Sequence, residues 1–182
     1  MKLALRTLLA LSVAFAVAAC KSTPEVEDTP ADTTPTTTPT DTGGEVTTAP
    51  LDPRDYTSDR ARENFDNAES LLSKRVIYFD FDKSDVKAEY RDILAAHAAY
   101  MGAHGSARIT LEGHADERGT REYNLGLGER RGNSVTGLLS AGGGRGSQLS
   151  VTSYGEERPV CRVSSEDCWW QNRRVEIVYT AR

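Results

Sequence analysis

The residues with the most chemical content lie between Gly113 and Arg131. Asp116 falls in a turn after a strand-like run, and the helical segment that follows carries Asn124, Leu127 and Arg131. Because these three residues are separated by three and four positions, they share one face of the helix. The carboxylate of Asp116 and the guanidinium of Arg131 then form an opposed pair of charges. Such a pair suits a zwitterionic ligand, with its ammonium on the carboxylate and its carboxylate on the guanidinium.

Strands alternate with helices around this motif. Apolar and polar residues alternate in four segments, which predicts strands with one buried face at 76–81, 108–114, 149–153 and 175–179. Helical spacing predicts one helix from about Lys87 to Met101, and a second that begins after Thr120 as N-cap and ends near Ser140. The order β-α-β-α-β-β predicts an α/β (α+β) fold, a two-layer sandwich with the helices on one face of the sheet.

Each predicted helix has a stripe of residues facing the core. The first stripe consists of Tyr90, Ile93, Leu94, His97 and Met101. The second consists of Leu125, Gly128, Gly132, Val135 and Leu139. His97 is therefore interpreted as a packed core histidine. The two glycines weaken the helix by about 1 kcal/mol each but allow a close approach to the sheet.

Residues 1–19 have the pattern of a secretory signal. Lys2 and Arg6 precede a short apolar core, and small residues precede Cys20. The apolar core is shorter than the roughly 20 residues that a bilayer span needs. A cysteine after small residues resembles the lipobox of bacterial lipoproteins, in which Cys20 becomes the acylated first residue. An ordinary signal peptide with a chance cysteine is the alternative, and Lys21 is compatible with sorting to the outer membrane.

Composition divides the rest of the chain at residue 70. Residues 21–70 hold twelve acids against four bases and are rich in Thr and Pro, which predicts a disordered acidic linker over 20–70. Residues 71–182 are nearly balanced, with sixteen bases and fifteen acids, and have the length of one compact domain. This domain has no basic patch, so nucleic acid is not expected as a partner.

Two further cysteines, Cys161 and Cys168, lie in a loop-like stretch near the end of the chain. If Cys20 is lipidated, they form an even pair in an exported, oxidising compartment, which predicts a disulfide. Zinc is a weaker interpretation because a zinc site needs four ligands and no histidine follows His114. Two free thiols are the remaining alternative.

The run that begins at Gly113, GHADERGTREYN, and continues through Leu127 to Arg131 resembles the OmpA-like peptidoglycan-binding domain family. Within that family it is most similar to the peptidoglycan-associated lipoproteins. The resemblance extends from about Arg75 to Tyr179 and implies the β-α-β-α-β-β sandwich already predicted.

The resemblance also implies a ligand, a location and partners. The matching positions in the family line a pocket for the diaminopimelate of the peptidoglycan stem peptide: Phe81, Asp82, Asp116, Asn124, Leu127 and Arg131. It implies a lipid-anchored protein at the periplasmic face of the outer membrane, which ties that membrane to peptidoglycan. Partners from the Tol system of envelope and cell-division proteins are also implied.

Other readings of the same residues stay open at this stage. An envelope protein-interaction module with weak wall binding is one, and a sugar hydrolase that uses the carboxylates of Asp82 and Asp116 is another. Asp116 and Arg131 could instead form an internal salt bridge. Arg118 and Arg121 are weaker candidates for ligand contacts, and solvated surface charge is the preferred interpretation of each. No nucleophile, cofactor or metal motif is complete, and the sequence therefore predicts a binding protein and not an enzyme.

Overall fold

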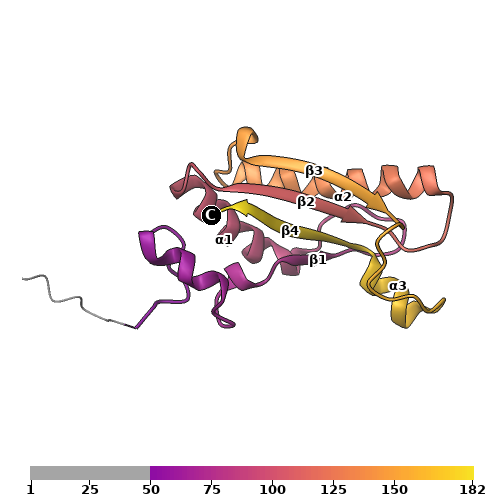
Figure 1. Cartoon of the computed structure of the whole chain (residues 1–182), viewed down its shortest axis with the longest axis horizontal. Coiled ribbons are helices and arrows are strands. Elements are labelled where there is room, and N and C mark those ends of the chain that lie inside the picture. The colour runs from indigo at the N-terminus through magenta and orange to yellow at the C-terminus, as the bar shows by residue number, and fades with distance from the viewer. Residues whose placement is uncertain (1–49) are drawn as a thin grey trace, which may run out of the picture. The chain divides into compact units, whose positions relative to one another are not determined.

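The computed structural model describes residues 50–182, which are coloured from indigo to yellow in Figure 1. The predicted signal peptide at 1–19, Cys20 and the linker up to residue 49 lie outside the described residues. Within 50–182, no helix is both long enough and apolar enough to cross a membrane.

Four strands form one mixed sheet in the order β1-β4-β2-β3. Their bounds are β1 Val76–Tyr78, β2 Arg108–His114, β3 Leu149–Gly155 and β4 Arg174–Ala181. Strand β4 is antiparallel to β1 and to β2, whereas β2 and β3 are parallel. Strands β1, β2 and β3 therefore run in the same direction. The segments that follow their carboxyl ends gather at one end of the sheet, together with the start of β4.

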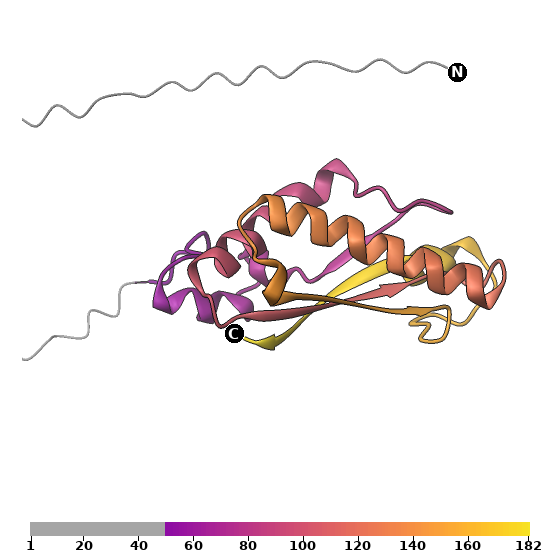
Figure 2. The ribbon, with the colours of Figure 1, turned by 90° about the horizontal axis from the view of Figure 1, so that it is seen from above.

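Helices α1 and α2 cover one face of this sheet (Figure 2). Helix α1 spans Arg91–Ala103, and α2 spans Arg121–Ala141. Thr120 is the N-cap of α2, because its hydroxyl accepts a hydrogen bond from the N–H of Tyr123. The predicted α/β sandwich and its element order are confirmed.

Three details differ from the sequence prediction. Strand β1 ends at Tyr78, before the predicted end at residue 81, and Asp82 then adopts a left-handed backbone with φ 57° that turns the chain. Helix α1 starts at Arg91 because a 3₁₀ turn, Ala88–Tyr90, precedes it. A third helix, α3 (Glu166–Asn172), lies between β3 and β4, where a loop was expected. Its seven residues are too few for a periodic pattern to stand out.

Helix α2 lies very close to the sheet because glycines face each other at the contact. A side chain at Gly113 in β2 would collide with the backbone of Gly128 in α2, and one at Gly132 would collide with Val151 in β3. Gly128 and Gly132 thus allow the close approach that the sequence predicted. The main apolar core fills the space between sheet and helices, and includes Ile77, Leu94, Leu111, Val135 and Ile177.

A second apolar cluster lies at the opposite end of the sheet from the gathered carboxyl ends. The 3₁₀ helices Asp59–Phe65 and Leu71–Ser73 place Phe65 and Leu72 in this cluster, where they are buried against α1. Residues 50–70 therefore pack on the domain through apolar side chains. The division expected from composition at residues 70 and 71 falls too late in the chain, because a few apolar residues in an acidic stretch are enough to dock it.

His97 is buried within this second end of the domain, as predicted. Its Nε2 lies 3.0 Å from the carbonyl oxygen of Lys74, so Nε2 must carry the hydrogen and donate it. Its Nδ1 lies 2.9 Å from the hydroxyl of Tyr179 and accepts that hydrogen. Burial lowers the pKa of His97 from 6.5 to about 4, so the ring is neutral.

Candidate ligand-binding site

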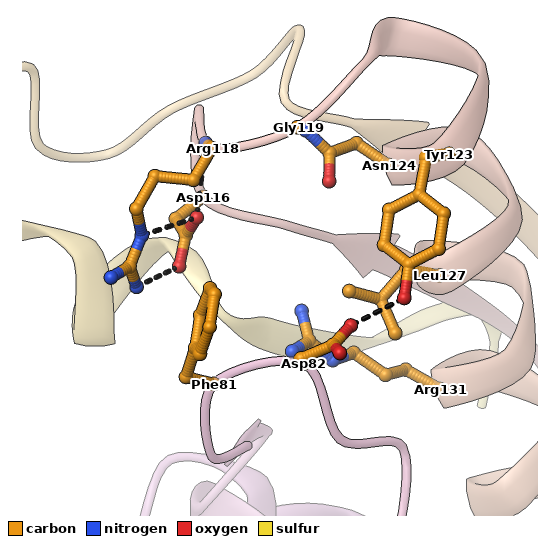
Figure 3. Close-up of a pocket in the computed structure, with 9 residues that line it drawn as sticks. All are labelled: Phe81, Asp82, Asp116, Arg118, Gly119, Tyr123, Asn124, Leu127 and Arg131. Atoms are coloured by element: carbon orange, nitrogen blue, oxygen red, sulfur yellow. Dashed lines mark hydrogen bonds and ion pairs between the residues drawn. The ribbon is translucent and has the colours of Figure 1, made fainter.

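A cavity of about 210 Å³ opens where the carboxyl ends of β1 and β2 meet the first turns of α2. Figure 3 shows its two sides: Asp116 and Arg118 from the turn after β2 lie opposite Tyr123, Leu127 and Arg131 from α2. The loop after β1 adds Phe81 and Asp82. All six residues predicted for the ligand pocket line this cavity: Phe81, Asp82, Asp116, Asn124, Leu127 and Arg131.

Asp116 is buried, and two arginines hold its carboxylate. Arg118 donates to Oδ1 from its backbone N–H and its Nε, both at 3.1 Å, and to Oδ2 from Nη2 at 2.7 Å. Arg173 donates to Oδ2 from Nη1 at 3.2 Å. Burial acts to raise the pKa of Asp116, but the hydrogen bonds from the two arginines outweigh it and hold the pKa below its ordinary value. Asp116 is therefore ionised, and its four acceptor positions are largely occupied.

Arg118 is held in place between two aromatic rings. The centre of its guanidinium lies 4.0 Å from the ring of Phe81 and 4.1 Å from the ring of Trp169. Such cation–π contacts add to its ion pair with Asp116. The interpretation of Arg118 as solvated surface charge was wrong, because the rings come from segments distant in the sequence. Arg121, by contrast, is an exposed charge paired with Glu157.

Arg131 is the only fully buried cation among the pocket-lining residues of the described domain. It donates to three backbone carbonyl oxygens: Nε to Lys83 at 2.8 Å, Nη1 to His114 at 2.7 Å, and Nη2 to Asp80 at 3.1 Å. Burial lowers its pKa to about 10, so it stays charged near neutral pH. Within residues 50–182 it makes no ion pair, so the internal salt bridge between Asp116 and Arg131 is not formed.

Asp82 provides the second carboxylate of the cavity. It is exposed, and Oδ1 accepts a hydrogen bond from the hydroxyl of Tyr123 (Figure 3). No ion pair of Asp82 occurs within the described part of the chain. Its left-handed backbone directs the loop over Arg131, and strained backbone of this kind concentrates at functional sites.

Asn124 and Leu127 complete the wall formed by α2. Leu127 presents an apolar surface between Tyr123 and Arg131. The side-chain amide of Asn124 donates to Glu156, which follows β3, and so ties the start of the helix to the sheet. Gly119, with φ 111°, allows the turn between Arg118 and the helix.

Sequence reasoning ranked Arg118 too low and missed three further residues of this site: Gly119, Tyr123 and Arg173. Gly119 and Tyr123 lie inside the motif that was singled out, and their proximity to Asp116 and Asn124 was an available signal. Arg173 lies 57 positions from Asp116, and only the antiparallel pairing of β2 with β4 brings the two together.

Cys161 and Cys168 form a disulfide, as predicted, with their Cα atoms 5.2 Å apart. Zinc and free thiols are therefore excluded for this pair. Cys168 lies in α3, next to Trp169, so the disulfide anchors the helix that carries one of the two rings around Arg118.

The carboxylate of Asp116 is poorly suited to act as a general acid. A glycosidase needs one carboxyl group that stays protonated near neutral pH. The pKa of Asp116 is shifted in the opposite direction, and its oxygens are engaged by arginines. Among residues 50–182, no group of three or more His, Cys, Asp and Glu side chains is arranged to hold a metal ion.

Several curated proteins with similar sequences carry the name peptidoglycan-associated lipoprotein. A peptidoglycan-associated lipoprotein of Pseudomonas putida is 51% identical over 108 residues, which cover 59% of this chain and 64% of that protein. One from Haemophilus influenzae is 46% identical over 103 residues, which cover 57% of this chain and 67% of that protein. The alignment thus spans about two thirds of the length of these relatives.

Solved structures agree with this likeness. The crystal structure of the peptidoglycan-associated lipoprotein from Burkholderia pseudomallei is 41% identical and superimposes with a TM-score of 0.62, covering 64% of this chain and 98% of that one. The C-terminal domain of Helicobacter pylori MotB shares the fold at 20% identity and a TM-score of 0.53, over 58% of this chain and 83% of that one. The OmpA family profile matches residues 78–173, from β1 to the residue before β4, and this chain belongs to the OmpA family.

Proposed function

We propose that this chain binds peptidoglycan non-covalently by holding the diaminopimelate of the stem peptide in the cavity at the end of the sheet. The observation that carries the proposal is Arg131. A buried guanidinium whose recorded partners are neutral carbonyl groups leaves a positive charge at the base of an open cavity. Burying a charge without an opposite charge is costly, so the site favours an anionic group of a ligand.

The carboxylate of diaminopimelate matches Arg131. A guanidinium has five N–H groups, and Arg131 uses three of them on backbone carbonyls within the described domain. The other two are available for a ligand carboxylate. The three carbonyl bonds fix the orientation of the guanidinium before the ligand arrives, which reduces the entropy lost on binding.

The ammonium of diaminopimelate matches the two carboxylates of the cavity. Asp82 is exposed to the cavity and has no cationic partner among residues 50–182, so it can contact the ammonium directly. Asp116 adds negative charge nearby, although its oxygens are shared with Arg118 and Arg173. Leu127 and the ring of Phe81 cover the aliphatic part between the two ends.

The size of the cavity favours one amino-acid side chain over a whole sugar unit. Its volume of about 210 Å³ lies below the roughly 300–1,000 Å³ that is usual for drug-sized ligands. The cavity is also open to solvent on one side, as a site must be if its ligand is part of a large polymer.

The N-terminal sequence completes the proposal with a membrane anchor. Cys20 would be acylated and hold the protein at the periplasmic face of the outer membrane, in keeping with the lipoprotein relatives. About thirty residues separate Cys20 from the packed domain, and fully extended they reach roughly 100 Å. That length allows a domain anchored to a membrane to reach a nearby wall polymer.

A second candidate function is a protein-interaction module of the envelope. Apolar side chains are exposed at the same end of the domain, with Phe81 53% exposed, Val160 59% and Val163 65%. Exposed apolar residues around a site favour protein contacts. Proteins of the Tol system are the partners that the family resemblance implies, and a partner that covers Phe81 would compete with wall binding.

Sedimentation with purified sacculi tests the proposed ligand. The protein should sediment with sacculi, and free diaminopimelate should release it, whereas lysine, which lacks the second carboxylate, should release far less. Binding that free diaminopimelate leaves unchanged would contradict the proposal and favour the protein-interaction module.

Substitution of the proposed lipidated cysteine tests the anchor. Cys20→Ser should abolish incorporation of a labelled fatty acid and release the protein from the outer-membrane fraction. Absence of the label from the wild-type protein would refute lipidation.

A further inference from the structure

We infer that the Cys161–Cys168 disulfide controls the affinity of the cavity, and that opening it by thiol–disulfide exchange weakens ligand binding without unfolding the domain. The inference rests on the proposed function of the cavity. It assigns a role to a covalent bond that lies outside the cavity and reaches it through three side chains: Trp169, Glu166 and Arg118.

The helix that the disulfide anchors, α3, carries two of the groups that hold Arg118. Trp169 stacks on one side of its guanidinium, and Glu166 lies 3.5 Å from its Nη2. Both residues belong to α3, within two positions of Cys168. Glu166 also accepts from Nη2 of Arg173 at 2.5 Å, so both arginines that bind Asp116 are braced by the same short helix.

Helix α3 depends on contacts outside itself. It has seven residues, and helices this short are unstable alone in water. The disulfide joins α3 to the loop that precedes it. The side chain of Asn172 provides a second tie, because it forms hydrogen bonds with the backbone of Val160 and Cys161. Opening the disulfide removes the covalent tie at the N-terminal half of the helix, where Glu166 and Trp169 lie.

The structure gives a reductant access to one sulfur of the pair. Cys168 is buried, but Cys161 lines a second cavity, of about 260 Å³, together with Glu117, Pro159 and Trp169. A thiolate entering this cavity can attack Sγ of Cys161. The sulfur of Cys168 then leaves as a thiolate, which the backbone N–H of Val163 stabilises from 3.0 Å.

A dithiol completes the exchange. Its second thiol attacks the mixed disulfide at the sulfur of the reductant, which frees Cys161 and closes the reductant into its own disulfide. Two electrons and two protons pass from the dithiol to the protein, leaving two thiols. No other co-reactant is needed, and an oxidant of the disulfide class reverses the step.

The expected result is a moderate loss of affinity. In the oxidised protein, Arg118 is already immobile between Phe81 and Trp169, and Asp116 is held in its binding orientation. When α3 is no longer tied by the disulfide, Arg118 becomes mobile. Ligand binding must then order this side chain, which costs free energy. Ordering one long side chain lowers affinity about two- to tenfold.

Titration of the full chain with sacculi in the oxidised and reduced states tests the inference. Dithiothreitol should weaken binding of the wild-type protein by about two- to tenfold, and reoxidation should restore it. The Cys161→Ser/Cys168→Ser variant should bind as weakly as the reduced protein and should not respond to dithiothreitol. Far-UV circular dichroism and thermal unfolding should show that each form is folded at the temperature of the assay.

Two neighbouring tryptophans supply a matched control. In the oxidised protein, Trp169→Ala should lower affinity as much as opening the disulfide does, and Trp169→Phe should restore most of it. Trp170→Ala should leave affinity unchanged, because Trp170 packs edge-on against Tyr78 and does not contact Arg118. Opening the disulfide in Trp169→Ala should add little, since both changes release the same arginine.

The outcomes separate this inference from the proposed function. If oxidised wild-type protein fails to bind sacculi, or diaminopimelate does not compete, the proposed function fails. If oxidised protein binds and reduced, folded protein binds equally well, the proposed function stands and the inference is overturned. A reduced protein that only melts at a lower temperature, with unchanged affinity below that temperature, also overturns it.

Discussion

The two ends of the sheet bury polar side chains in opposite ways. At the end covered by residues 56–73, the buried polar groups are neutral: His97 binds the hydroxyl of Tyr179 and the carbonyl of Lys74. At the other end, the buried groups include the charged side chains of Asp116, Arg131 and Arg173, and Arg131 contacts carbonyl groups without a carboxylate partner. Both ends lie on the same sheet, and His97 and Arg131 are both fully buried.

The difference separates stability from function. A neutral, hydrogen-bonded group costs little to bury, and the aromatic rings around it add packing energy. A buried guanidinium that no carboxylate contacts directly reduces stability, so its presence indicates a use that offsets the cost. The neutral end therefore holds the domain together, and the charged end holds a place for a ligand. Changes at the neutral end should lower stability without changing ligand binding, whereas changes at the charged end should change ligand binding.

Removing the central ring of the neutral end should have the largest effect on stability. Phe65 is buried, and its ring packs edge-on against Tyr100 and Tyr179 at centroid distances of 4.9 and 4.6 Å. Phe65→Ala should lower the free energy of unfolding by about 3–5 kcal/mol, measured by urea titration. Sacculus binding per folded molecule should not change. A loss of binding in protein that remains folded would contradict the separation of the two ends.

Acid should destabilise the neutral end through His97. Its pKa is about 4 in the folded domain and 6.5 when exposed, so below pH 6.5 the unfolded chain takes up a proton that the folded domain does not. The stability from its neutral form is complete above pH 6.5 and is lost as the pH falls to 4, by up to about 3 kcal/mol. His97→Gln should flatten this decline in urea titrations. His114, whose pKa is also lowered to about 4, is present in both proteins and cancels in the comparison.

At the neutral end, the sequence predicted the buried face of the first helix but not the segment that docks against it. Helical spacing placed His97 among core residues, because local periodicity records which face of a helix is buried. Composition assigned Phe65 to the acidic linker, so the domain boundary was set too late. The stretch around Phe65 is mostly polar, and the two short 3₁₀ helices that carry it have no periodic signal.

At the charged end, the motif and its family resemblance identified six residues that line one cavity. The partners of Asp116 were not predictable in the same way. Arg173 reaches Asp116 through strand pairing, and Trp169 reaches Arg118 from α3. Both contacts join segments about fifty residues apart, and spacing along one element contains no information about them.

Replacing the buried cation should have the largest effect on binding. Arg131→Lys keeps the charge but loses the fork that binds three carbonyls and a carboxylate together. Loss of a charge-assisted pair of about 1.5–3 kcal/mol should reduce sacculus affinity at least about tenfold. Arg121→Lys, an exposed arginine of the same helix, is the control and should bind normally. Normal binding by folded Arg131→Lys would refute the assignment of the carboxylate subsite.

Asp116→Asn should lower both binding and stability. The amide cannot neutralise Arg118 and Arg173, and Arg173 is buried. We expect about 1–3 kcal/mol less stability in urea titrations, with affinity for sacculi reduced several-fold, because the wall of the cavity loses its order as well as its charge. Combined with Arg131→Lys, the loss of affinity should be smaller than the sum of the two, since both groups act on one ligand. Strict additivity would indicate two independent sites.

Asp82→Asn should produce the smallest effect and the most selective one. Asp82 is exposed, and its only recorded hydrogen bond within the described domain is accepted from Tyr123, so losing its charge should leave the free energy of unfolding nearly unchanged. An exposed ion pair contributes about 0.2–1 kcal/mol, so affinity for sacculi should fall only about two- to fivefold. Added salt should reduce the difference between this variant and the wild type, because exposed charges are screened. Unchanged affinity at low salt would indicate that Asp116, and not Asp82, makes the direct contact with the ammonium. Asp82 would then only add negative charge nearby.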